Sequence, residues 1–154
     1  MNNLTQIQEF LGQKRLAVVG VSRNPKDFTR SVYAELLRRD YDVVPVNPEA
    51  PDIAGRRCYA HVTEIEPPVD GALLMTKPAV TDRVVQECQA AGIRKIWMYR
   101  ATGSGAVSTA AVRYCAANGM SVVAGECPFM FLPESAWFHR FHGFCRRLVG
   151  SYSD

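Results

Sequence analysis

The stretch LAVVGVSRNPKDFTRSV, residues 16–32, decides the fold of this chain. Its apolar run, Leu16 to Val19, stops at Gly20 and passes into a polar loop, and a helical pattern begins near Thr29. This order is typical of a buried parallel strand that leads into a helix N-terminus, where backbone N–H groups and the helix dipole favour an anion. The side chains after the glycine that can donate hydrogen bonds to phosphate oxygens are Ser22, Arg23, Lys26, Thr29 and Arg30.

A phosphate-bearing ligand is the first hypothesis for this loop, and the alternative is a plain strand-to-helix turn with solvated charges. The dinucleotide fingerprint G-x-G-x-x-G is absent, because only Gly20 is present and Ser22 stands where the second glycine would be. The loop therefore favours a nucleotide-like ligand while weakening the usual NAD interpretation.

The composition predicts one domain spanning residues 1–154, since 154 residues with 47% hydrophobic content can form a core covered on two sides. The net charge of +3 is mild and its basic residues are spread out, which argues against nucleic-acid binding. No apolar run approaches the roughly 20 residues of a membrane span. The five cysteines (58, 88, 115, 127 and 145) show neither C-x-x-C nor zinc-site spacing and indicate reduced thiols. We expect a cytoplasmic protein without a metal site and with neither a membrane nor a nucleic-acid partner.

Strand-like and helix-like segments alternate along the chain. Strands are expected at residues 16–21, 41–46, 69–75, 95–99 and 120–124, with a short one at 58–59; helices are expected at 4–11, from about 29 to 37, 78–91, 108–118 and 135–149. Alternation of this kind predicts an α/β fold, a three-layer sandwich with a mostly parallel five-stranded sheet and helices on both faces. Residues 12–130 form its expected core, and the helix at 135–149 closes it.

Ligands in such sheets bind beyond the carboxyl ends of the strands, where the strand order reverses. The segments that should meet there are residues 21–23, 47–48, 76–78, 100–105 and 125–128. Most of them carry glycine, proline or short polar residues that permit close approach of a ligand. The sequence therefore predicts a binding site at this edge.

Several of these segments resemble the CoA-binding domain family, which includes the CoA-binding domain of the succinyl-CoA synthetase alpha subunit. The resemblance rests on VVGVSRNP (18–25), VVPVNP (43–48), VDGALLMTKP (69–78) and KIWMY (95–99), and it runs from about Leu16 to Pro128. It implies a Rossmann-like domain that holds CoA by its pyrophosphate and adenosine portions.

The resemblance also assigns the site by position. It implies that Gly20, Val21, Ser22 and Arg23 hold the pyrophosphate, with Thr29 and Arg30 at the helix start. Asn47 and Pro48 would border the adenosine ribose, and Thr76, Lys77 and Pro78 would border the adenine.

Asn47 offers separate chemical support for CoA. NAD-binding domains place an acid at the end of the second strand, which a phosphate on the ribose of CoA would repel, whereas Asn47 is neutral. Glu49, however, lies where the synthetases tend to have a basic residue. Arg56 or Arg57 is the alternative partner for the 3′-phosphate.

Cys127 completes the candidate site. It is either an ordinary buried thiol or a thiol near the CoA sulfhydryl that forms a mixed disulfide under oxidation. Glu126 beside it is interpreted as a solvated or capping carboxylate rather than a general base.

The expected function is non-catalytic binding of CoA or an acyl-CoA, as a sensor or carrier; the alternative is an NAD(P)-binding protein or oxidoreductase on the same fold. The synthetases use a phosphorylated histidine on a separate ligase domain, and His61, His139 and His142 lie outside the matched positions. No complete catalytic constellation is visible, so a complete ligase is not expected. The aromatic segment at 137–144 is expected to pack on the domain edge or across a homodimer, with an exposed partner or membrane surface as the alternative.

Overall fold

The computed structural model describes residues 2–101 and 103–133. Its central sheet is formed by β1 (Arg15–Val19), β2 (Asp42–Val46), β5 (Gly71–Leu74), β6 (Lys95–Tyr99) and β7 (Ser121–Glu126), in the spatial order β2-β1-β5-β6-β7. All neighbouring strands are parallel. The predicted α/β fold with a five-stranded parallel sheet is confirmed.

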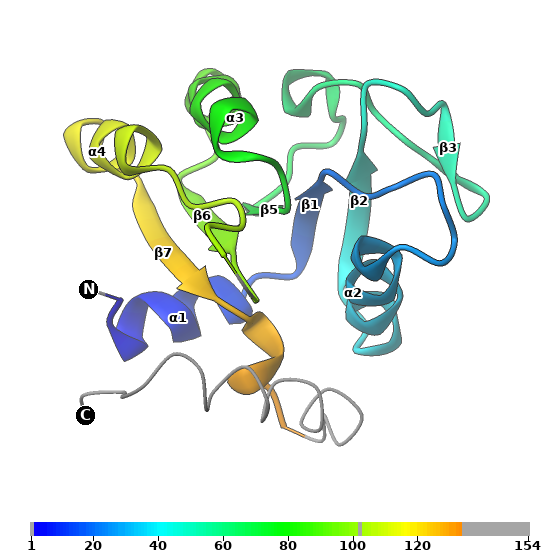
Figure 1. The fold of residues 1–154 in the computed structure, drawn as a ribbon, viewed down its shortest axis with the longest axis horizontal. Helices are drawn as coiled ribbons and strands as arrows, with labels where there is room; N and C mark the ends of the chain where they lie inside the picture. The colour runs from blue at the N-terminus through cyan, green and yellow to red at the C-terminus, as the bar shows by residue number, and fades with distance from the viewer. Residues whose placement is uncertain (1, 102, 134–154) are drawn as a thin grey trace.

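Helices cover both faces of this sheet (Figure 1). One face carries α1 (Leu4–Leu11) and α2 (Phe28–Arg38), and the other carries α3 (Pro78–Ala90) and α4 (Thr109–Ala117). Successive side chains of β1 alternate between the two faces of the sheet. Leu16 and Val18 pack towards α1 and α2, and Ala17 and Val19 pack towards α3 and α4. A strand buried on both sides needs a continuous apolar run, which is why residues 16–19 carry no polar residue.

The segment between β2 and β5 is where the prediction differs from the structure. The expected strand at residues 58–59 is replaced by a small hairpin of β3 (Asp52–Ile53) and β4 (Arg56–Arg57), and Tyr59 forms a single bridge with Val46. Two short 3-10 helices, η1 (Val62–Glu64) and η2 (Pro128–Met130), complete the elements. The helix expected at 135–149 and the aromatic segment at 137–144 lie outside the described residues.

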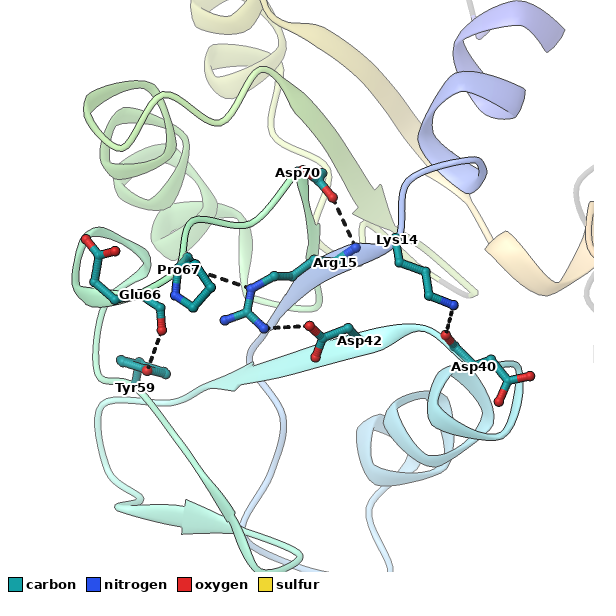
Figure 2. Close-up of polar contacts among 8 residues, drawn as sticks. All are labelled: Lys14, Arg15, Asp40, Asp42, Tyr59, Glu66, Pro67 and Asp70. Atoms are coloured by element: carbon teal, nitrogen blue, oxygen red, sulfur yellow. Dashed lines mark hydrogen bonds and ion pairs between the residues drawn. The ribbon is translucent and has the colours of Figure 1, made fainter.

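Polar contacts tie β1, β2 and β5 together at their amino ends (Figure 2). The Arg15 backbone N–H donates to Asp70 Oδ2 at 3.1 Å, its Nε donates to the Pro67 carbonyl at 3.1 Å, and its Nη1 lies 2.7 Å from Asp42 Oδ2. Beside them, Lys14 Nζ donates to the Asp40 carbonyl at 2.6 Å. These contacts join the amino ends of the three strands, and the carboxyl ends of the same strands lie side by side at the opposite edge of the sheet.

The described helices include none that is both long and apolar enough to cross a membrane.

Candidate functional site

The carboxyl ends of β2, β1 and β5 meet at the edge of the sheet opposite the Arg15 contacts. After β1 the chain continues through α2 to β2, which lies on one side of β1. It later returns to β5, which lies on the other side of β1. This reversal creates the kind of crevice in which open parallel sheets bind ligands. The predicted site segments at 21–23, 47–48 and 76–78 follow these three strands.

Gly20 makes the turn after β1 possible. Its φ is +95°, and a Cβ built there would lie 2.7 Å from the Met75 carbonyl oxygen and 3.3 Å from Thr76 Cγ2. Its N–H donates to the Val46 carbonyl at 2.9 Å. Only glycine meets both requirements, because the backbone is left-handed and the neighbouring chain leaves no room for a side chain.

The donors predicted to bind phosphate are partly engaged inside their own loop. The Thr29 hydroxyl accepts from the Ser22 N–H at 2.9 Å and donates to Asp27 Oδ1 at 2.6 Å. Arg30 Nη1 donates to the carbonyls of Ser22 at 3.5 Å and Arg23 at 3.2 Å. Thr29 and Arg30 therefore shape the loop. The hydroxyl of Ser22 accepts from the Asn24 N–H, and its own proton stays available to donate.

The N-terminus of α2 already carries a carboxylate. Asp27 is its N-cap and accepts from the Thr29 N–H at 2.9 Å. The helix thus begins at Phe28, one residue before the predicted start. A negative side chain at this position competes with any anionic ligand for the field of the helix.

The Asn47 side chain joins two loops of the site. Its Nδ2 donates to the Val21 carbonyl at 2.8 Å, and its Oδ1 accepts from the Glu49 N–H at 2.8 Å. A carboxylate could not make the first of these bonds, because it has no proton to donate. The neutral amide predicted from ribose chemistry therefore also has a structural reason.

A cavity of about 520 Å³ lies between these strand ends and α3. Among the predicted residues, those that line it are Gly20, Asn47, Pro48, Thr76 and Lys77.

The wall on the α3 side comes from one face of the helix, at the spacing i, i+3, i+4, i+7: Val80, Arg83, Val84 and Glu87. His61 closes the opposite side, with its Nδ1 3.3 Å from Glu87 Oε1. Arg83, Glu87 and His61 were not predicted from the sequence. The helical spacing after Pro78 could have indicated that Arg83 and Glu87 share the face of the helix that lines the cavity. No local pattern in the sequence pointed to His61.

A second cavity of about 220 Å³ lies between the start of α2 and the carboxyl ends of β5 and β6. Its walls are mainly apolar and include Phe28 from the start of α2, Met75 after β5 and Tyr99 at the end of β6. Thr76 and Lys77 line both cavities. The two cavities therefore adjoin at this segment.

Of the remaining predicted residues, Thr29 lines the second cavity, and the others line neither cavity. Val21 is fully buried, Pro78 is the first residue of α3, and Arg23 is exposed with its Nη2 3.9 Å from Glu49 Oε2. Cys127 is 2% exposed, so a disulfide with CoA would require this thiol to become accessible. The adduct remains a prediction, and burial of the thiol works against it.

The two arginines considered for the 3′-phosphate lie on the exposed hairpin. Arg57 is stacked over the Tyr59 ring, 4.5 Å from its centroid, and neither Arg56 nor Arg57 lines the two cavities. The role of Arg56 or Arg57 at the 3′-phosphate therefore stays a prediction, with neither side chain in the lining of the two cavities.

The four cysteines in the described part of the chain are buried and form no disulfide with one another. Burial raises the pKa of Cys58, and it raises the pKa of Cys115 to about 11, so both thiols are protonated at neutral pH. Residues 2–101 and 103–133 contain no group of three or more side chains suited to hold a metal ion.

Most of the described chain matches a known protein family. A family model described as a CoA binding domain matches residues 14–133. The acetate–CoA ligase (ADP-forming) of Methanocaldococcus jannaschii is 26% identical over 81 residues, which are 53% of this chain but only 12% of the ligase.

Two further relatives are similar in size to this chain. The uncharacterized protein YneT of Bacillus subtilis is 25% identical over 123 residues, covering 79% of this chain and 88% of YneT. A solved hypothetical protein from Pyrococcus horikoshii superposes with a TM-score of 0.76 at 28% identity, covering 84% of this chain and 89% of the other.

Proposed function

This chain belongs to the CoA-binding domain family, and we propose that it binds CoA or an acyl-CoA at the carboxyl edge of its sheet. The observation that carries the proposal is the pair of cavities that adjoin at Thr76 and Lys77, the first of which is also lined by Gly20. CoA is elongated, with an adenosine at one end, a pyrophosphate in the middle and a pantetheine arm at the other. Two adjoining cavities beside a turn that can approach phosphates suit a molecule of this form.

The larger cavity is proposed to take the adenosine. Its volume of about 520 Å³ lies within the range of small-molecule sites, and valines from β1, β2 and α3 give it apolar walls for a base. Asn47 and Pro48 would then border the ribose, and Thr76 and Lys77 the adenine.

The turn after Gly20 is proposed to hold the pyrophosphate, with the Ser22 hydroxyl and Arg23 as donors. Arg23 and Glu49 are both exposed and 3.9 Å apart, so the guanidinium can leave this weak pair for a phosphate. The pantetheine arm would continue along the smaller cavity, past Phe28, Met75 and Tyr99.

We further propose that this binding is non-catalytic and serves a sensor or carrier. In the described part of the chain neither serine nor cysteine lines the two cavities, which removes the commonest nucleophiles from the proposed site. The match to the acetate–CoA ligase covers only 12% of that enzyme, so its ligase activity is not carried over to this chain.

Native mass spectrometry and isothermal titration calorimetry test the proposal. Native mass spectrometry of the protein purified without added ligand distinguishes bound CoA, NAD and nothing. Isothermal titration calorimetry with CoA and with NAD⁺ at matched salt should show tighter binding of CoA, since neither the glycine fingerprint nor the acid at the end of β2 is present. Equal or tighter binding of NAD⁺ would refute the proposal.

A further inference from the structure

The walls of the larger cavity carry two cations and two carboxylates. Each carboxylate has a neighbour: Glu49 lies 3.9 Å from Arg23 Nη2, and Glu87 lies 3.3 Å from His61 Nδ1. The side chains of Lys77 and Arg83 make no hydrogen bond or ion pair within residues 2–101 and 103–133. The cavity therefore presents two cations that are available to an anionic ligand.

Arg83 and Glu87 lie four residues apart on α3 but do not form an ion pair with each other. Residues four apart on a helix face each other, and opposite charges at that spacing usually attract. Here Glu87 is turned to His61, which is brought to the cavity by the chain after β4, and Arg83 stays unpaired on the cavity face of α3 within the described residues. The tertiary contact through His61 thus leaves the guanidinium available.

The proposed function identifies which anion would lie here, and this inference rests on it. If the adenosine of CoA occupies the larger cavity, its ribose 3′-phosphate lies there too. A phosphate monoester carries about −1.5 to −2 charges at pH 7, which two cations can match with charge-assisted hydrogen bonds.

Glu49 and the arginines of the hairpin indicate which wall of the larger cavity the 3′-phosphate faces. A phosphate beside Glu49 would be repelled, and Arg56 and Arg57 line neither cavity. The α3 wall is the side of the cavity on which Lys77 and Arg83 lie, and the carboxylate of that wall, Glu87, faces His61 at 3.3 Å. We propose that Lys77 and Arg83 bind the 3′-phosphate of CoA, so that this cavity selects CoA over 3′-dephospho-CoA.

The test is calorimetric titration of the full chain with CoA and with 3′-dephospho-CoA. The wild-type protein should bind CoA at least about tenfold more tightly. Arg83→Ala should weaken the binding of CoA by about tenfold while changing that of 3′-dephospho-CoA by less than about twofold, because only CoA carries the phosphate that Arg83 contacts. Lys77 also borders the adenine, so Lys77→Ala should weaken the binding of both ligands, and that of CoA by about tenfold more than that of 3′-dephospho-CoA.

The matched control is Arg113→Ala, which removes an exposed arginine from α4 that lines neither cavity; it should leave both affinities unchanged. Arg83 is exposed and alanine is a good helix former, so the variant should fold, and Arg83→Gln provides a second neutral variant. If every variant keeps the wild-type ratio of the two affinities, the assignment of Lys77 and Arg83 is wrong although CoA binding stands. If the wild-type protein binds neither ligand, the proposed function itself fails and this inference with it.

Discussion

At the residue scale, Gly20 and Asn47 connect the three strand ends that build the site. Gly20 lets the β1 turn lie against Met75, and Asn47 links the same turn to the segment after β2 through Val21 and Glu49. Neither role needs the side chain to touch a ligand. Both residues define where the backbone of the candidate site lies.

Gly20→Ala should lower the free energy of unfolding by about 2–4 kcal/mol. The left-handed backbone alone costs about 1–2 kcal/mol for alanine, and the 2.7 Å approach to the Met75 carbonyl adds strain that a rigid strand end cannot relieve. Urea unfolding followed by circular dichroism measures this loss.

Gly55→Ala is the matched control, because Gly55 also has a positive φ, +76°, but a Cβ added there would meet no atom within 4 Å. It should cost about 1–2 kcal/mol, the backbone contribution alone. Equal losses for the two variants would show that the close contact at Gly20 is not costly.

At the element scale, the N-terminus of α2 is held by its own cap. Asp27 accepts from the N–H and the hydroxyl of Thr29, and Thr29 in turn accepts from the Ser22 N–H. The start of α3 differs, since Lys77 is its N-cap and makes no side-chain capping bond. The two helices that border the cavities therefore begin with opposite charges.

Asp27→Asn should increase the affinity for CoA by about two- to fivefold at low salt. Asparagine caps a helix about as well as aspartate, so the loop is kept, while the negative charge that opposes a pyrophosphate at this end is removed. Calorimetry gives the affinity and urea unfolding checks the stability.

Asp27→Ala separates the two effects of this residue. Loss of the cap should cost about 1 kcal/mol of stability. An affinity for CoA that is identical in the wild type and in Asp27→Asn would mean that the pyrophosphate does not lie near the start of α2.

At the scale of the whole molecule, α1 is part of the core although the family match begins only at residue 14. Phe10 is 3% exposed, and its ring centroid lies 5.3 Å from that of Trp97 on β6. The Asn2 side chain also pairs with both the N–H and the carbonyl of Ala124, which protects the edge strand β7. The segment before residue 14 therefore stabilises the far side of the sheet.

Phe10→Ala should lower the free energy of unfolding by about 3–5 kcal/mol, since it leaves a cavity beside Trp97. Leu4→Ala is the control on the same helix: Leu4 is 61% exposed, and its truncation should change stability by less than about 0.5 kcal/mol. Similar, small effects of both changes in urea unfolding would show that α1 does not contribute to the core.

The sequence by itself determined the alternation of strands and helices, the turn at Gly20 and the edge of the sheet at which we propose the site. The strands, helices and turn follow from the local periodicity of apolar residues. The edge of the sheet follows from the general rule that parallel crossovers are right-handed. The sequence also determined the family through the segments around Gly20, Asn47 and Lys77.

Only the tertiary structure decided which side chains meet. The hairpin at residues 52–57, the bond from Asn47 to Val21 and the approach of His61 to Glu87 join parts of the chain that are far apart in sequence. Such contacts depend on how α3, β2 and the segment after β4 pack, and no local pattern encodes that packing. For the same reason the available cations of the cavity, Lys77 and Arg83, became visible only once the neighbours of each carboxylate were known.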